Sequence, residues 1–337
     1  MIMKAYELQN KPGFDSLTLV EHPEPKPGYS EIVVRVRATS LNYRDLIIAQ
    51  GQNKSVKFPV VPMSDGAGDV VAIGEGVTRV NVGDRVAGIF FQTWLAGNIT
   101  QLIMQSAMGG EIDGMLAEYV VLNQDGVVIL PDNISYEEGA TLPCAAVTAW
   151  HGLVTKGNLT AGESLLVLGT GGVSIFALQF AKMHGAKVIV TSSSDEKLQQ
   201  AKALGADEII NYKKTPNWEE QVLALTNGIG VDQVVEVGGA GTLTKSIQAV
   251  RYGGQVNLIG VLSGFGGEIN PSPVMQKSVT LQGIYVGSRD MFEAMNRAIS
   301  QAQLKPVIDR VFPFTEATAA YEYMKSGAHF GKVVIKL

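Results

Sequence analysis

The chain has 337 residues, 46% of them hydrophobic and 18% charged, with a formal net charge of −5, an ordinary soluble composition with room for two domains. No run of lysine and arginine exceeds two residues, which argues against nucleic acid and anionic lipid and favours a small-molecule partner. The segment MIMKAYEL lacks a signal-peptide core, and no uncharged 18-residue stretch has membrane-spanning character, so we expect no membrane partner and a cytoplasmic location.

The first 125 residues have the pattern of a mostly β domain. Short apolar runs such as 32–36 and 70–73 alternate with prolines and glycines that mark turns. A strand is expected at 32–38, and a polar patch, Asn42–Asp45, follows it. Further on, Ser64 and Asp65 precede a glycine-rich turn, where they either line a site or shape the turn.

From about residue 162 strands and helices alternate, which predicts an α/β fold with a doubly wound parallel sheet and right-handed crossovers. The expected strands are 164–168, 187–192, 208–212, 231–237, 255–261 and 279–286, and the expected helices are 173–183, 195–204, 217–226 and 241–250. The tail carries helices 290–302 and 315–326 and strands 307–312 and 332–336. It has no second glycine fingerprint, so we expect it to complete the first domain.

A strand, a tight turn and a helix at residues 164–183 predict a nucleotide site. The glycines of the turn give the backbone room to bend and let a pyrophosphate approach, and the helix N-terminus supplies amide donors. Ser174 occupies the third glycine position, where a small residue still permits close packing of helix on strand. We expect the pyrophosphate to contact Gly169, Thr170, Gly171, Gly172 and Val173.

The residues after the next strand indicate which nucleotide binds. An NAD-binding fold places an acid about 20 residues beyond the first glycine to hold the ribose hydroxyls. That zone here reads Val190–Ser194, and Lys197 follows it. Small hydroxyls and a cation suit a 2′-phosphate, so we expect contacts from Ser192, Ser193 and Lys197, and NADPH in preference to NADH. The first acid, Asp195, is expected to cap the following helix.

The ends of later strands should also face the nucleotide. Gly238 and Gly239 end the fourth strand of the predicted sheet, and Val261 ends the fifth. Open parallel sheets bind ligands at this edge. In the tail, Lys332 either reaches a phosphate or is solvated.

Several motifs follow one another along nearly the whole chain. They are KPGYSEIVVRVRATSLNYRD (26–45), GEGVTRVNVGDRV (74–86), LAEYVV (116–121), ATLPCAAVTAWHGL (140–153), the glycine turn and HFGKVVI (329–335). With these motifs the chain resembles the medium-chain dehydrogenase/reductase superfamily. The resemblance implies a GroES-like catalytic domain, 1–125 with 291–337, and a Rossmann dinucleotide-binding domain, 126–290, with nicotinamide and substrate in a cleft between them.

The resemblance also bears on zinc. Zinc-dependent members hold the catalytic metal through a Cys, a His and a second Cys, and the matching positions here are Asn42, Ser64 and Cys144. An amide, a hydroxyl and one thiol make a very poor zinc site, and a chain with one cysteine has no cysteine-rich structural zinc lobe. We therefore expect no metal and a likeness to the zinc-free branch, which includes quinone oxidoreductases and enoyl reductases.

Catalytic candidates come from the polar patch. We expect Asn42, Tyr43 and Ser64 to be catalytic, with Tyr43 donating a hydrogen bond or proton to the substrate oxygen. The alternative for Tyr43 is an interface aromatic with its hydroxyl in water. Arg44 and Asp45 are expected to pair or to cap the following helix rather than to take part in catalysis.

Two further expectations rest on the resemblance. Tyr212 resembles a residue that flanks the adenosine phosphate in related reductases, and the alternative is an aromatic packed at a strand end. The apolar strand 279–286 is expected to join a homodimer edge to edge, against an alternative in which helix 290–302 covers it.

These observations predict a zinc-independent, NADPH-preferring oxidoreductase that transfers hydride to a quinone, an activated double bond or a related carbonyl, with NADH as the second choice of cofactor. One alternative is an alcohol dehydrogenase acting on alcohols and aldehydes. Another, of a different class, is a non-catalytic NADPH-binding sensor or structural protein.

Overall fold

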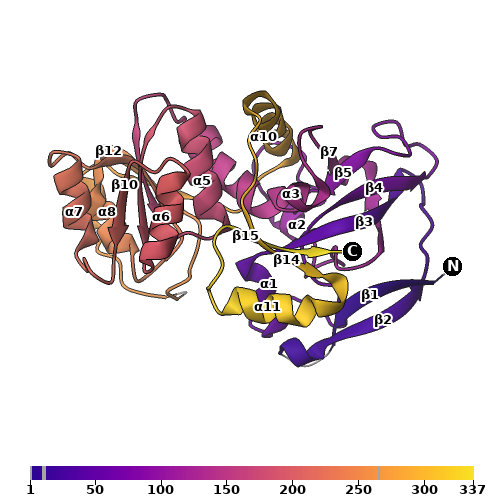
Figure 1. The fold of residues 1–337 in the computed structure, drawn as a ribbon. Helices are drawn as coiled ribbons and strands as arrows, with labels where there is room; N and C mark the ends of the chain where they lie inside the picture. Colours follow the sequence, from indigo (N-terminus) through magenta and orange to yellow (C-terminus); the bar gives the residue numbers. More distant parts are fainter. Residues whose placement is uncertain (1, 10–12, 265) are drawn as a thin grey trace. The chain divides into compact units, whose positions relative to one another are not determined.

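The computed structural model describes residues 2–9, 13–264 and 266–337. The chain divides into two compact units, Met1–Val147 with Gly287–Leu337, and Thr148–Val286 (Figure 1). Each unit has its own hydrophobic core, which includes Leu46 and Tyr321 in the first and Leu166 in the second. In the described part of the chain, no helix is long and apolar enough to cross a membrane.

A seven-stranded sheet organises the first unit. Its order is β14-β15-β3-β4-β5-β7, with β6 also paired to β3, and every pair except β14 with β15 is antiparallel. Strands β1 and β2 form a separate antiparallel pair. The bounds are β1 (Ile2–Leu8), β2 (Leu17–Pro23), β3 (Glu31–Leu41), β4 (Asp65–Ile73), β5 (Arg85–Gly88), β6 (Tyr119–Asn123), β7 (Val127–Ile129), β14 (Ile308–Pro313) and β15 (Lys332–Lys336).

The central strand β3 is longer than its apolar pattern predicts. The pattern ends at residue 38, but β15 pairs antiparallel with the rest of the strand, up to Val333 opposite Leu41. On the other side of β3, Ser40 lies opposite Asp65 at the start of β4. The longer strand therefore brings the polar patch that follows it next to the second polar segment at residues 64 and 65.

Short helices complete the first unit. Helix α11 packs against β15, β3 and α1, and Tyr321 on α11 belongs to the same core as Leu46 on α1. The bounds are α1 (Tyr43–Ala49), α2 (Gln101–Met104), α3 (Tyr136–Gly139), α10 (Arg289–Ala302), α11 (Ala317–Lys325), the π-helix η3 (Leu142–Ala146) and the 3-10 turns η1 (Phe14–Ser16), η2 (Gln124–Gly126) and η5 (Phe314–Glu316).

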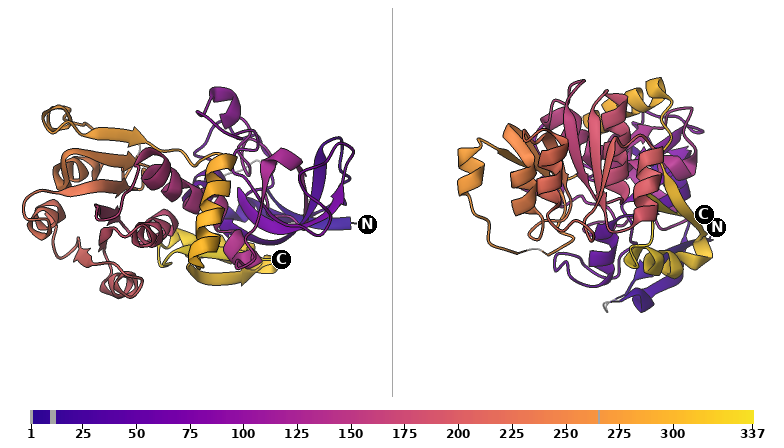
Figure 2. Two further views of the ribbon diagram at one scale, coloured as in Figure 1. Left: turned by 90° about the horizontal axis from the view of Figure 1, so that it is seen from above. Right: turned by 60° about the vertical axis from the view of Figure 1, so that its left-hand side comes forward.

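The second unit is a six-stranded, fully parallel sheet with the order β10-β9-β8-β11-β12-β13. The order reverses between β8 and β11, as in the doubly wound dinucleotide-binding fold. Helices α5 to α8 pack against its strands (Figure 2). The predicted α/β fold is confirmed. The bounds are α4 (Val147–Trp150), π-helix η4 (His151–Lys156), β8 (Ser164–Leu168), α5 (Gly172–Met183), β9 (Lys187–Ser192), α6 (Asp195–Ala203), β10 (Glu208–Asn211), α7 (Trp218–Leu225), β11 (Val231–Glu236), α8 (Leu243–Ala249), β12 (Val250–Leu258), α9 (Ser272–Gln276) and β13 (Thr280–Gly283).

Several predicted boundaries in this sheet are wrong. Strand β12 begins at Val250, directly after α8, and ends at Leu258, because the amides of Ile259 and Gly260 turn to the carbonyl of Glu236. Strand β13 covers only half of the predicted strand 279–286. The chain leaves strand geometry after it, and Val286 has a positive φ of 55°.

Candidate active site

The first polar cluster lies where β3 passes into α1. Asn42 is the N-cap residue of α1, and its backbone N–H donates to Oδ2 of Asp45 at 2.7 Å. Asp45 therefore caps the helix, as the sequence predicts, and it is buried. Burial, opposed by the hydrogen bond from Asn42, raises the pKa of Asp45 to about 7. The side chain of Asn42 is left available for other contacts.

The side chain of Asn42 contacts Lys332, the first residue of β15. Lys332 is 3% exposed, and its Nζ donates to the carbonyl of Leu41 at 2.7 Å and to Oδ1 of Asn42 at 2.6 Å. Burial lowers the pKa of Lys332, and the field of Asp65 opposes the shift. Neither sequence reading of Lys332, a phosphate contact or a solvated lysine, is correct. The pairing of β15 with β3 holds it inside the first unit.

Ser64 and Asp65 complete the cluster. The residue before them, Met63, is buried with a φ of 70°, a left-handed conformation that turns the chain sharply ahead of β4. Ser64 Oγ donates to Asp65 Oδ1 at 2.7 Å and accepts from Asn42 Nδ2 at 3.4 Å. The structure thus brings two of the predicted catalytic residues, Asn42 and Ser64, into contact.

Cys144 adds a backbone donor to this cluster. It lies in the π-helix η3, and its N–H donates to Asp65 Oδ2 at 3.1 Å. Burial raises the pKa of Asp65, opposed by Lys332 and by hydrogen bonds from Asn42 and Ser64. Burial, and next the Asp65 carboxylate, raise the pKa of the Cys144 thiol. Both causes favour the thiol over the thiolate at this position.

The donor set does not fit zinc. The amide oxygen of Asn42 already accepts from the Lys332 ammonium, and the Ser64 hydroxyl donates to Asp65. Within the described ranges, no three His, Cys, Asp or Glu side chains form a group that could hold a metal ion. A divalent cation here would lie beside the Lys332 ammonium.

The remaining residues of the polar patch point elsewhere. Tyr43 begins α1 and is 44% exposed. Arg44 turns the other way, where it forms an ion pair with Glu111 at 2.7 Å, donates to the carbonyl of Met108 at 2.8 Å and lies over the ring of Phe90. Arg44 is therefore structural, while Tyr43 keeps its hydroxyl in an accessible position.

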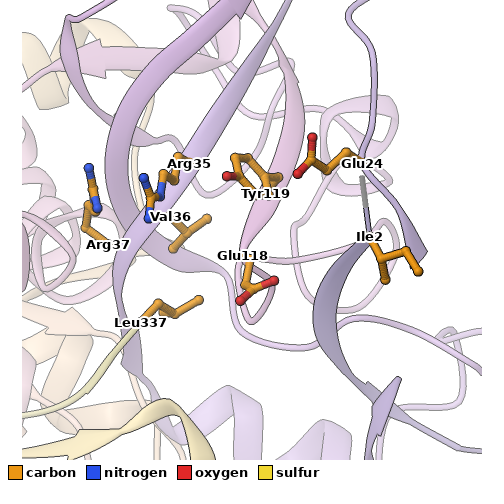
Figure 3. Close-up of a pocket in the computed structure, with 8 residues that line it drawn as sticks. All are labelled: Ile2, Glu24, Arg35, Val36, Arg37, Glu118, Tyr119 and Leu337. Carbon is orange, nitrogen blue, oxygen red and sulfur yellow. The ribbon is translucent and has the colours of Figure 1, made fainter. Parts of the chain in front are cut away.

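A surface hollow of the first unit lies apart from this cluster. Its volume is about 170 Å³. Figure 3 shows the side chains around it: Ile2, Glu24, Arg35, Val36, Arg37, Glu118, Tyr119 and Leu337. Two of the four charged groups on its walls are already bonded, since Arg37 pairs with Asp69 at 2.7 Å and Glu118 accepts from the backbone of Lys4. The hollow contains none of the predicted site residues.

In the second unit, the glycine turn joins β8 to α5. Gly169 has a φ of 75°, and Gly171 is the N-cap residue of α5. A Cβ on Gly171 would meet no atom within 4 Å, so the space above this backbone is open. Ser174 is buried, and its hydroxyl donates to the carbonyl of Leu168 at 2.7 Å. Serine thus replaces the third glycine by bonding the helix to the strand.

The predicted 2′-phosphate residues gather at the carboxyl ends of β9 and β10. Ser192 pairs with Asn211, and its carbonyl accepts from the backbone N–H of Tyr212 at 3.1 Å. Tyr212 follows β10 and is 41% exposed, so both sequence readings, a phosphate neighbour and an aromatic packed at a strand end, stay open. Ser193 and Lys197 belong to the turn and helix that follow β9.

Asp195 is not the cap of α6. Ser194 is the N-cap residue, and its Oγ accepts from the backbone N–H of Lys197 at 3.3 Å. Asp195 is the first helical residue and forms an ion pair with Lys214. The sequence could not separate the two, because serine and aspartate are both good caps.

A buried carboxylate shapes the next strand end. Glu236 ends β11, and its Oε1 accepts from the backbone N–H groups of Gly238 at 2.7 Å and Gly239 at 3.0 Å. Gly239 has a φ of 84°, and a Cβ there would lie 2.9 Å from the Cα of Val261. Sequence reasoning missed Glu236, although an acid at the end of an apolar strand is a readable signal. This residue is bonded to two predicted cofactor positions, Gly238 and Gly239.

Two family models match successive parts of the chain. Residues 28–132 match the model of the alcohol dehydrogenase GroES-like domain, and residues 172–301 match that of the zinc-binding dehydrogenases. A zinc-type alcohol dehydrogenase-like protein of Schizosaccharomyces pombe is 47% identical over 335 residues, 96% of each chain.

Solved structures give the same picture. A Sinorhizobium meliloti protein described as an alcohol dehydrogenase superposes with a TM-score of 0.94 at 44% identity, over 100% of this chain and 99% of the other. An NAD-dependent alcohol dehydrogenase superposes with a TM-score of 0.91 at 33% identity, over 99% of this chain and 100% of the other.

Proposed function

Because this chain belongs to the medium-chain dehydrogenase/reductase superfamily and is an oxidoreductase of the nicotinamide-dependent kind, we propose that it is a zinc-independent reductase that prefers NADPH. Its acceptors are quinones, activated double bonds or related carbonyls. In such acceptors the charge gained with the hydride spreads onto an oxygen, so hydrogen-bond donors can take the place of a metal.

The Lys332 ammonium is the observation that carries this proposal. It lies 2.6 Å from the amide oxygen of Asn42, the residue that the resemblance places at a zinc-ligand position. A cation already bonded to one of the three candidate ligands disfavours a second, divalent cation beside it. We assign Asn42 to the polarising wall, with Ser64 accepting from its NH₂ group, and the half-exposed Tyr43 to the proton supplied after hydride transfer.

The second unit would hold the cofactor. Bound NADPH supplies the hydride. The turn Gly169–Val173 would bind its pyrophosphate, and the buried Glu236 would keep the Gly238–Gly239 turn in shape below it. Ser192, Ser193, Lys197 and Tyr212 would surround the 2′-phosphate. The surroundings of these residues support NADPH. Asp195, the first acid after β9, is already bonded to Lys214 and Asn211.

The test uses the purified, metal-stripped protein with NADPH and a panel of quinones, 2-alkenals and aldehydes. Loss of absorbance at the nicotinamide band with a quinone or 2-alkenal, at a rate unchanged by added zinc, is the expected result. Tight NADPH binding without turnover of any acceptor would leave only the non-catalytic binding protein. A lower Kd for NADH than for NADPH would reverse the cofactor assignment.

An alcohol dehydrogenase is the second candidate, and the names of the relatives favour it. The yeast relative, at 47% identity, and the Sinorhizobium protein, at 44%, both carry alcohol dehydrogenase names. This candidate predicts oxidation of alcohols that stops on chelation and returns with zinc. Elemental analysis of the protein before stripping, together with that assay, separates the two.

We also propose a homodimer joined at β13. This strand is the last of the sheet order, and Leu281 on it is 37% exposed. A free parallel edge with an apolar side chain invites pairing with a second copy. Light scattering should give twice the mass of the chain, and Leu281→Lys should give the monomer mass, while a wild-type monomer would reject the dimer.

A further inference from the structure

Lys332 is the most unusual side chain of the first unit. Lysine is rarely buried unless its ammonium is paired, yet Lys332 is 3% exposed. Two of its bonds go to the carbonyl of Leu41 at 2.7 Å and to the amide oxygen of Asn42 at 2.6 Å. The first bond and the pairing of β15 with β3 fix the ammonium relative to the end of β3. The second bond fixes the side chain of Asn42, the residue that follows β3.

This contact determines which way the Asn42 amide faces. An ammonium can only donate, so the atom 2.6 Å from it must be the amide oxygen. The NH₂ group is then directed to the opposite side, where it donates to Ser64 Oγ at 3.4 Å. That bond is long and holds the amide weakly, and the Asn42 side chain also hydrogen-bonds the Asp65 carboxyl.

Asn42 and Asp45 form a capping box at the start of α1. An N-cap asparagine normally uses its side-chain oxygen to accept from the first turn of the helix. Here Asp45 accepts from the backbone of Asn42 in return, and the Asn42 oxygen is also bonded to Lys332. Of Asn42, Ser64, Asp65 and Lys332, Asn42 has the largest exposed fraction, 7% against 0%, 0% and 3%. Among these four residues, Asn42 is therefore the one least covered by protein.

We propose that Lys332 is a positioning residue for the reduction: its ammonium locks the Asn42 amide so that the NH₂ group, and not the carbonyl, is offered to the acceptor oxygen. This inference rests on the proposed function. Without the ammonium the amide can rotate, and its oxygen would then repel the oxygen that gains charge. The loss should appear in the chemical step, because only the transition state carries that charge.

The experiment is a double-mutant cycle on kcat with the acceptor that the wild-type protein turns over. Asn42→Ala removes the donor, and we expect kcat to fall on the order of 100-fold, the usual loss for such a donor. Lys332→Met keeps most of the buried volume and should lower kcat at least 10-fold, with KM changed less than kcat. The double variant should be no slower than Asn42→Ala, because Lys332 acts through Asn42.

Two controls accompany the cycle. Lys336, on the same strand, is exposed and forms an ion pair with Glu137 at 2.7 Å, so Lys336→Met should keep the wild-type kcat. NADPH affinity should stay unchanged in every variant, since the cofactor residues lie in the second unit. If Lys332→Met does not fold, Lys332→Gln keeps a neutral donor and replaces it, with an intermediate loss expected.

The outcomes separate the two proposals. Wild-type kcat in Asn42→Ala would remove Asn42 from the proposed function and this inference with it. A slow Asn42→Ala with wild-type kcat in the Lys332 variant overturns the inference alone. A double variant whose loss of kcat equals the product of the two single-variant losses also overturns the inference alone. If Lys332 only neutralises Asp65, Asp65→Asn combined with Lys332→Met would restore kcat, which also overturns it.

Discussion

Asp45 should make the stability of the first unit depend on pH. Its carboxyl is buried, and its pKa is raised to about 7 in the folded protein, against about 3.9 in the unfolded chain. Below pH 4 both states are protonated. Between pH 4 and 7 the unfolded chain releases the proton and the folded one keeps it, so the free energy of unfolding should fall by about 1.4 kcal/mol per pH unit. Above pH 7 the loss of unfolding free energy relative to pH 4 stays constant, at about 4 kcal/mol.

Asp45→Asn should remove this pH-dependent loss of unfolding free energy. The asparagine oxygen can still accept from the backbone of Asn42, as Oδ2 of Asp45 does at 2.7 Å, and it never ionises. The variant and the wild type should differ little at pH 4, and the variant should gain progressively up to pH 7. Acids with lowered pKa values, such as Asp69 and Asp232, act in the opposite direction, but they are common to both proteins and cancel in the difference.

Urea unfolding at several pH values between 4 and 8 measures the difference. Trp94 lies in the first unit, so its fluorescence, in a background carrying Trp150→Phe and Trp218→Phe, reports that unit alone. Asp84→Asn is the matched control, because that carboxylate also accepts from a backbone N–H three residues away, at 2.8 Å, but in an exposed turn. Parallel pH profiles for the wild type and Asp45→Asn would refute the reasoning.

Three further predictions concern the second unit. Gly238→Ala should weaken NADPH binding and lower stability, because its Cβ would lie 2.3 Å from Oγ1 of Thr242. Calorimetric titration would detect the first effect and thermal melting the second. An unchanged Kd would exclude this turn from the cofactor site. Ser174→Ala should cost about 1 kcal/mol of unfolding free energy, since it removes the bond from α5 to Leu168, and chemical denaturation should show this with NADPH affinity unchanged. Lys197→Met should raise the Kd for NADPH about tenfold, because one charge-assisted hydrogen bond is lost, and it should leave the Kd for NADH unchanged. Equal effects on both nucleotides would place Lys197 away from the 2′-phosphate.

The sequence predicted the main features of the fold because they are local. The apolar strand, the glycines and the helix at residues 164–183 specify a strand, a turn and a helix by short-range geometry, and the structure has all three. The repeated alternation of strand and helix predicted the parallel sheet. Boundaries failed where neighbouring strands decide them, as at Leu41, where β15 extends β3. The cap of α6 failed because Ser194 and Asp195 have similar capping propensity.

The arrangement of the polar cluster was decided by tertiary structure. The sequence singled out Asn42 and Ser64, but nothing local connects them with Lys332, which lies 290 residues further along the chain. Strand pairing brings the three together, β4 beside β3 on one edge and β15 beside it on the other. Burial then changes what each group can do, because an ammonium and a carboxylate removed from water must find partners within the fold. The residue types determined the class of chemistry, and the packing of three strands determined which atoms face one another.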